Sequence, residues 1–191
     1  PVDRRQRQMC IRDRSDAADN NGMFYKYVSY LQIENGTSWI GLSNGQLLLI
    51  DDFSKSIYPI STSIGVIYPT TITIDDLIWI GGIRNFSSDN SSISAITKNF
   101  KDIKNYKDSN YSNFSKVDFF SNKSIDNEVW FGSQGSVTIY NKRSDFFRTL
   151  GYEKGIPIQK VKHIEYLNDK VYIASRNDLV VLDKKTKKIV D

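Results

Sequence analysis

Short apolar runs, separated by polar or glycine-containing turns, make up this chain from about residue 24 onward. Many of the runs alternate apolar and polar positions or are rich in β-branched and aromatic residues, which is typical of strands. No segment keeps a 3.6-residue apolar period, so we expect little helix. The pattern predicts an all-β protein.

One of these strands carries a tripeptide that recurs: Trp39-Ile-Gly, Trp79-Ile-Gly, Trp130-Phe-Gly and, as a variant, Tyr172-Ile-Ala. The anchors lie 40, 51 and 42 residues apart. Strand repeats of about 40–45 residues are the signature of propeller blades, which usually hold four strands each. After three of the anchors comes a second apolar run that ends in an acid or amide, at 46–51, 136–141 and 179–183.

We therefore expect a partial β-propeller of about four blades, mostly of four antiparallel strands, arranged as an open arc rather than a closed ring. The expected blades span residues 24–62, 66–107, 111–150 and 158–191. In the third blade we expect a strand over residues 116–120, ahead of a turn at Asp126-Asn127. The tryptophan supplies buried area, and the glycine after it leaves room for a neighbouring blade.

The first residues do not fit this pattern. Residues 4–14 resemble the translation of a transposase sequencing adapter, which residues 4–13 match over ten consecutive codons. We interpret residues 1–14 as non-native and disordered, and residues 15–23 as a loose segment. The alternative is a basic arm that binds nucleic acid or an anionic surface. If the segment is non-native, the natural N-terminus is missing, and the sequence is silent on a signal peptide.

Removing this segment changes the charge of the protein. The chain has a formal net charge of +4, and residues 1–14 hold five arginines and two aspartates. The other 177 residues carry only +1, which argues against a nucleic-acid partner. The one cysteine, Cys10, lies in the same segment, so the remaining chain has no thiol for catalysis or metal binding. No run of 18 apolar residues exists that could cross a membrane as a helix.

Few residues suggest chemistry. His163, the only histidine, lies in an alternating strand without an evident nucleophile or metal partner, and we expect a surface or packing role. The acid pairs Asp51-Asp52 and Asp75-Asp76 sit at strand ends, where neighbouring side chains point to opposite faces, so we interpret them as turns.

We also interpret two further segments as structural rather than functional. The oxygen-rich loop 84–92 lacks the acid spacing of a calcium loop. The lysines at 184, 185, 187 and 188 flank Thr186 in a basic turn that keeps a sheet edge soluble. We therefore predict no catalytic, cofactor-binding or metal-binding residue, no cofactor, and no enzymatic activity for this segment.

The copies as a set resemble the two-component regulator propeller repeat. That repeat reads roughly as Gly-Leu-Pro, a strand, a turn, Trp-Ile-Gly-Thr, a Gly-Leu turn and Tyr-Asp. Gly155-Ile156-Pro157 matches the start, and the tryptophan tripeptides match the middle. The ends Ile50-Asp51 and Tyr140-Asn141 match the close. The resemblance covers nearly all of the chain beyond residue 22. The copies depart from it at Leu42, Gly82, Ser133, Tyr172 and Ala174.

The resemblance implies a function that no single residue shows. It implies a non-enzymatic ligand-sensing domain in the periplasm or at the surface of a bacterium, part of a hybrid two-component regulator. Its partners would be an extracellular ligand such as a glycan, further blades and downstream signalling domains, with no nucleic acid or membrane contact by this segment. Two alternatives stay open: a structural or interaction propeller of a cell-surface or type IX secretion component, and an enzyme whose site lies on other blades.

Overall fold

The computed structural model describes residues 28–34, 36–42, 47–51, 57–60, 68–83, 93–99, 101–106, 117–152 and 155–190. Every secondary-structure element named within these ranges is a β-strand, as the apolar pattern predicts. The predictions for residues 1–14, 15–23 and the loop 84–92 lie outside the described residues.

The first two sheets each contain four antiparallel strands in chain order, joined as successive hairpins. The strands of the first sheet are β1 (Val28–Glu34), β2 (Thr37–Leu42), β3 (Leu47–Asp51) and β4 (Ile57–Ile60). Those of the second are β5 (Tyr68–Ile74), β6 (Leu77–Ile83), β7 (Ile93–Thr97) and β8 (Ile103–Tyr106).

The third sheet repeats this arrangement, and the fourth is shorter. The third holds β9 (Phe119–Ile125), β10 (Glu128–Ser133), β11 (Ser136–Asn141) and β12 (Phe146–Gly151). The fourth holds β13 (His163–Leu167), β14 (Lys170–Ala174) and β15 (Leu179–Asp183). In place of a fourth strand, one isolated bridge pairs Leu182 with Ile189.

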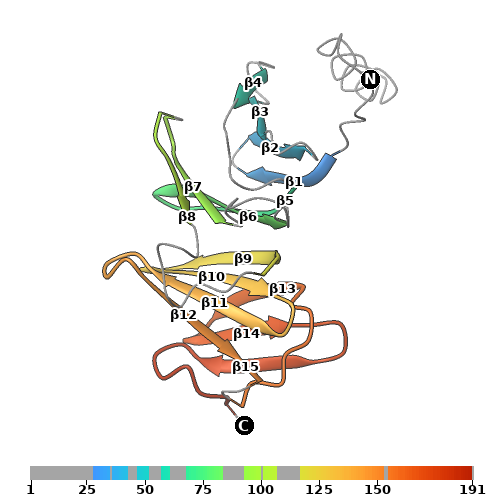
Figure 1. Ribbon diagram of the computed structural model, residues 1–191, viewed down its shortest axis with the longest axis vertical. Helices are drawn as coiled ribbons and strands as arrows, with labels where there is room; N and C mark the ends of the chain where they lie inside the picture. The colour runs from blue at the N-terminus through green and yellow to red at the C-terminus, as the bar shows by residue number, and fades with distance from the viewer. Residues whose placement is uncertain are drawn as a thin grey trace.

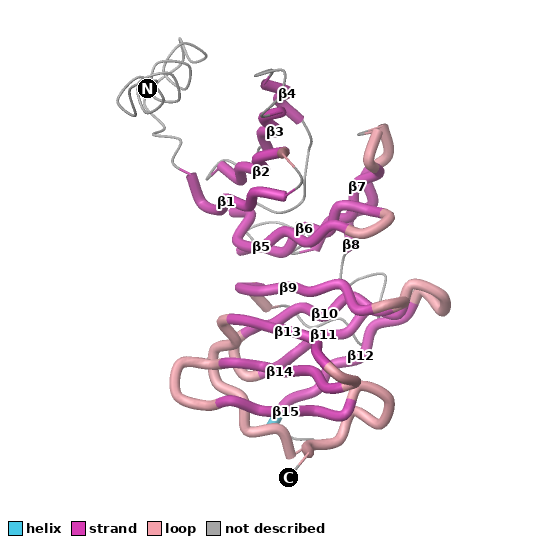
Figure 2. Tube along the Cα trace, turned by 180° about the vertical axis from the view of Figure 1, so that it is seen from behind, coloured by secondary structure: helices cyan, strands magenta, loops and turns pink. Residues whose placement is uncertain are grey.

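The four sheets follow one another as an open arc, with the first and last sheets at opposite ends of the molecule (Figures 1 and 2). The first strand of each sheet lies on the inner side of the arc, because β5 contacts β1 and β9, and β9 contacts β13. This is the arrangement of propeller blades about an axis. The predicted fold class is confirmed: an all-β, partial and open propeller. The exact blade boundaries remain a prediction.

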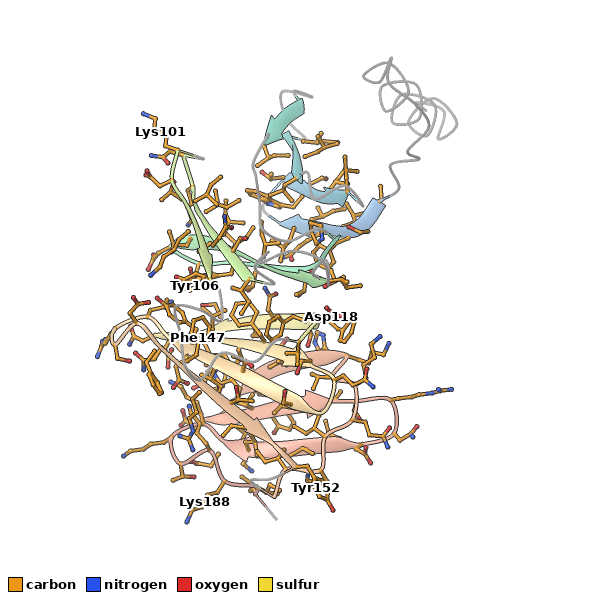
Figure 3. The ribbon with its side chains drawn as sticks, in the orientation of Figure 1. Lys101, Tyr106, Asp118, Phe147, Tyr152 and Lys188 are labelled. Carbon is orange, nitrogen blue, oxygen red and sulfur yellow. The ribbon has the colours of Figure 1, made fainter. Side chains whose placement is uncertain are left out.

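The hydrophobic core lies between successive sheets rather than inside one. One cluster joins Trp39 and Leu47 to isoleucines of the second sheet. The next joins the second and third sheets, where the rings of Trp79, Tyr106, Tyr140 and Phe147 pack in stacked, tilted and edge-on pairs with centroids 4.8–5.8 Å apart. Figure 3 labels Tyr106 and Phe147 on the two sides of this contact. Full burial of one such ring contributes on the order of 2–3 kcal/mol. The last cluster places Trp130 against the fourth sheet.

The glycine of each tryptophan tripeptide lies where the next sheet comes closest. A Cβ atom on Gly41 would lie 2.8 Å from the Pro69 Cβ, and one on Gly81 would lie 3.2 Å from the Phe119 Cβ. On Gly132 it would lie 2.3 Å from the Val161 Cγ1. The distances at Gly41 and Gly132 are shorter than real Cβ contacts, and the distance at Gly81 is tighter than most of them, so the missing side chain allows the close spacing of the sheets, as the sequence predicts.

The outer faces of the two end sheets carry large exposed side chains. On β1, Leu31 and Ile33 are 56% and 67% exposed, whereas Ile72 in the register position of Leu31 on β5 is buried against the first sheet. On the fourth sheet, Leu167 and Leu179 are 58% and 63% exposed. The exposed residues of each end face thus stand at register positions whose equivalents in the inner sheets pack against a neighbouring sheet.

One predicted strand is misplaced. The expected strand over residues 116–120 is instead β9, which runs from Phe119 to Ile125. Its sequence holds Asn122, Lys123 and Ser124, which hide the apolar pattern that usually marks a strand. These polar residues belong to the innermost strand of the third sheet.

Candidate ligand pocket on the inner strands

A pocket of about 330 Å³ lies where the inner strands of all four sheets come together. This volume is at the small end of the range of about 300–1,000 Å³ that is typical of ligand sites. The lining is mostly polar, with aromatic rings from Tyr30 and Phe120. The other lining residues are Gln32, Thr71, Ile72, Thr73, Ser121, Asn122, Lys123, Lys162, His163 and Ile164.

Strand register explains why these residues meet. In each of the first three sheets, the inner-strand residue that pairs with the tripeptide glycine lines the pocket. In the fourth sheet, Ala174 stands in place of that glycine, and its partner also lines the pocket. These four residues are Tyr30, Thr71, Ser121 and His163. The residue paired with the tryptophan lines it in the first three sheets: Gln32, Thr73 and Lys123. The pocket is therefore built from equivalent positions that differ in side chain from one sheet to the next.

Hydrogen bonds fix part of the lining. The Tyr30 hydroxyl donates to the Gln32 side-chain oxygen at 2.9 Å. The Thr71 hydroxyl donates to the Asn122 Oδ1 at 2.6 Å, and the Asn122 Nδ2 donates to the Trp79 carbonyl at 3.1 Å. Asn122 stands at a register position that Ile72 and Ile164 fill in other sheets, so it replaces an apolar contact with a polar link between the second and third sheets.

Charged groups gather on the side of the third and fourth sheets. The Lys123 Nζ lies 2.7 Å from the Glu165 Oε1, and the His163 Nε2 lies 3.7 Å from the Glu165 Oε2. Burial by itself would raise the pKa of Glu165. The hydrogen bonds from Lys123 and from the backbone N–H of Tyr166 outweigh it, so this pKa lies below its ordinary value. Glu165 is therefore charged at neutral pH and balances Lys123.

The serine and the histidine of the pocket do not form an activated nucleophile. The Ser121 Oγ is buried and has no hydrogen-bond partner among the described residues. An activated serine requires a hydrogen bond to a base such as histidine. The arrangement suits binding of a polar ligand better than nucleophilic catalysis. No group of three or more metal-ligating side chains occurs within the described ranges, and the absence of a metal site remains a prediction.

Among the described residues singled out in the sequence as chemical candidates, only His163 is in the pocket lining, and its side chain is 71% exposed at the pocket edge. Asp75 and Asp76 form the bend between β5 and β6, as predicted. Asp75 also accepts hydrogen bonds from the Leu77 N–H at 2.8 Å and the Trp79 Nε1 at 3.0 Å. Asp51 ends β3, and Asp52 lies outside the described residues.

The basic turn after β15 does more than solubilise an edge. Lys184 pairs with Asp126, and the Lys187 Nζ lies 2.6 Å from the Glu128 Oε2 and 4.7 Å from the Trp130 ring centroid. These lysines join the fourth sheet to the third, which the sequence interpretation missed.

Sequence reasoning also missed the pocket residues of β9. An alignment of the copies on their tryptophans would have found part of this set, because Gln32 and Lys123 each lie seven residues before the tryptophan. Thr73 lies six residues before Trp79, so a one-residue gap in the second copy is needed to place it with them, as the strand pairing does.

No family model and no curated protein sequence matches the chain. Solved structures do match. One is the extracellular domain assigned to hybrid two-component system BT3049 of B. thetaiotaomicron, with a TM-score of 0.66 and 12% identity over 91% of this chain. A second, BT4673 of the same organism, has a TM-score of 0.63 and 15% identity over 91% of this chain.

The chain has the fold of these extracellular domains. It spans only 24% of the length of each of the two. A third match is an auxiliary nutrient binding protein from Bacteroides thetaiotaomicron, with a TM-score of 0.60, 17% identity, and coverage of 85% of this chain and 40% of that one. The first two belong to the class of protein that the tryptophan repeat resembles. In the described part of the chain, no helix is long and apolar enough to cross a membrane.

Proposed function

We propose that this chain is part of the extracytoplasmic sensing propeller of a bacterial two-component regulator, in the periplasm or at the cell surface. In this role it binds a polar extracellular ligand, with glycans as the first class to test, and it catalyses no reaction. Its further partners are other blades and the signalling domains of the same regulator.

The observation that carries this proposal is the polar pocket on the inner strands. A packed propeller needs apolar residues between its sheets, but nothing in the packing requires Gln32, Thr73 or Lys123 at equivalent inner positions. Concave sites with a few convergent polar groups are typical of ligand binding. The fold match to extracellular domains of two-component systems and the repeat resemblance support the sensing role.

The test uses the complete regulator in its bacterial host. A transcriptional reporter measures the response to a panel of glycans, and the Thr73→Val and Gln32→Leu variants remove polar pocket groups with little change in volume. We expect both variants to weaken the response while the protein level is maintained. Asp76→Asn, at an exposed bend away from the pocket lining, is the control.

Two results would refute the sensing role. One is a complete gene that encodes neither a membrane helix nor a kinase, with a C-terminal sorting domain in their place, which would favour the secretion-linked propeller. The other is a reporter response that the pocket variants leave unchanged.

A further inference from the structure

The charge of the pocket lining is one-sided. Lys123 and Lys162 line it together with His163, and no carboxylate is among the described lining residues. Glu165 lies just beyond the lining and pairs with Lys123. Glu165 therefore balances the charge of Lys123 and leaves the charge of Lys162 without a partner among the described residues at this edge.

Lys162 is the lysine without a counter-charge. Its side chain is exposed, and it has no ion-pair partner in the described ranges. Its backbone is fixed, because the Lys162 N–H donates to the Ala174 carbonyl at 2.8 Å. The base of the side chain is thus held at the start of β13, while its ammonium group is available to a ligand.

A second group in the pocket also lacks an acceptor. Ser121 is only 6% exposed, lines the pocket, and has a hydroxyl without a hydrogen-bond partner among the described residues. A buried hydroxyl without a partner is costly, so such groups usually bond to water or to a ligand. Together, Ser121 on β9 and Lys162 immediately before β13 offer a neutral donor and a charged donor.

We propose that this pocket binds an anionic group of its ligand, a carboxylate or a sulfate, with Lys162 as the main contact. This inference rests on the proposed ligand-binding role and adds the charge of the ligand. Charge-assisted hydrogen bonds from an ammonium group to such oxygens are about twice as strong as neutral ones. Lys123 is positioned to turn from Glu165 toward the same anion.

His163 provides a direct readout, because it is the only histidine of the chain and lines the pocket. Its ring-proton NMR signal, recorded on the full chain, reports binding there without ambiguity. The probes are sodium sulfate, trigalacturonate and the methyl ester of trigalacturonate, each titrated to about 10 mM at low ionic strength. Sulfate and trigalacturonate distinguish the two anionic groups, and the ester removes the charge from the same sugar backbone.

We expect the His163 signal to shift and saturate with at least one anion and not with the ester. The Lys162→Gln variant should weaken that binding about tenfold, as expected for loss of a charged hydrogen bond. Lys188→Gln is the matched control, since this exposed lysine lies at the far end of the fourth sheet, away from the inner strand β9 (Figure 3). Circular dichroism of each variant shows that the β-fold is retained.

Three results overturn the inference. Equal binding of the ester and the acid means that charge plays no part, while the sensing role would stand. No shift with either anion means that the pocket has no anion site, and the reporter assay with neutral glycans then decides the sensing role separately. Equal weakening by Lys162→Gln and Lys188→Gln would assign the effect to overall charge and would also contradict a specific site.

Discussion

At the scale of single residues, Asp75 carries more contacts than its place in a bend suggests. It accepts hydrogen bonds from the Leu77 N–H, the Trp79 indole and the Ser124 hydroxyl, and its Oδ2 lies 2.8 Å from the Lys142 Nζ. Burial by itself would raise the pKa of Asp75. The bonds from Lys142, Ser124 and Leu77 outweigh burial, so the pKa lies below the ordinary value of 3.8.

This lowered pKa predicts a pH dependence of stability. A carboxyl group whose folded pKa is depressed stabilises the fold above its unfolded pKa, and the contribution is lost as the pH falls through the folded value. The Asp75→Asn variant should therefore be less stable than the parent at pH 7, and the gap should narrow as the pH falls below about 4. Urea unfolding across this range measures the gap. A gap independent of pH would contradict the assignment, and Asp76→Asn is the exposed control.

Gly132 predicts a different kind of sensitivity. A methyl group there would lie 2.3 Å from the Val161 Cγ1 and 2.4 Å from the Ser121 Oγ, so Gly132→Ala must push the third and fourth sheets apart. We expect a loss of about 1–3 kcal/mol in the free energy of unfolding, which is usual for overpacking. Chemical denaturation measures it. The reverse change at the equivalent end position, Ala174→Gly, should cost about 1 kcal/mol or less, because no further described sheet packs there. Similar losses in both variants would contradict a close-contact effect.

At the scale of elements, two neighbouring pairs of sheets are each linked by an ion pair between a lysine and an aspartate, and the two ion pairs stand at equivalent positions of the repeat. Lys142 follows β11 and reaches Asp75 in the bend of the second sheet, and Lys184 follows β15 and reaches Asp126 in the turn of the third. The tripeptide register makes these two pairs equivalent. The pairs differ in exposure, since Asp75 is 18% exposed and Asp126 is 58% exposed.

The difference in exposure predicts unequal contributions. The Lys142→Gln variant should lose about 1–2 kcal/mol of stability, because it leaves a half-buried carboxylate without its counter-charge. The Lys184→Gln variant should lose less, since water and salt screen Asp126. Denaturation at low and at high salt compares the two. A larger loss for Lys184→Gln, or equal salt sensitivity, would show that exposure does not set the strength of these pairs.

The sequence predicts the elements better than their contacts. The tryptophan tripeptides place β2, β6 and β10 because packing between sheets imposes the same residue types on every copy. The strand β9 is misplaced because the pocket imposes polar residues on it, and local pattern cannot distinguish such a strand from a loop. The lysine links depend on which turns of two different sheets meet, and the pocket depends on the register of four strands. Neither is encoded within a single stretch of sequence.

At the scale of the whole molecule, the two end sheets present apolar faces that the inner sheets bury. Leu31, Ile33, Leu167 and Leu179 are more than half exposed. Large apolar side chains that are exposed at positions buried elsewhere in a repeat are consistent with a contact surface. In the regulator proposed above, further blades would cover it.

This surface predicts self-association of the isolated chain. We expect sedimentation velocity to show association that increases with protein concentration, because burial of apolar area favours contact between copies. The Leu31→Lys and Leu179→Lys variants each place a charge on one end face and should reduce it, and the combined variant should reduce it most. Thr186→Lys, in the exposed turn after β15, is the control for added charge. A chain that stays monomeric at high concentration would contradict the prediction.

The inner strands divide the chain into positions that recur and positions that vary. The tryptophan and the glycine set the spacing between sheets, whereas their strand partners Gln32, Thr73 and Lys123 face the pocket and differ in every copy. The hydrophobic clusters around the tryptophans and the close contacts of the glycines do not include these partners. The ligand preference of the pocket can therefore change during evolution one blade at a time. Duplicated blades can acquire new pocket side chains while the packing between the sheets stays the same.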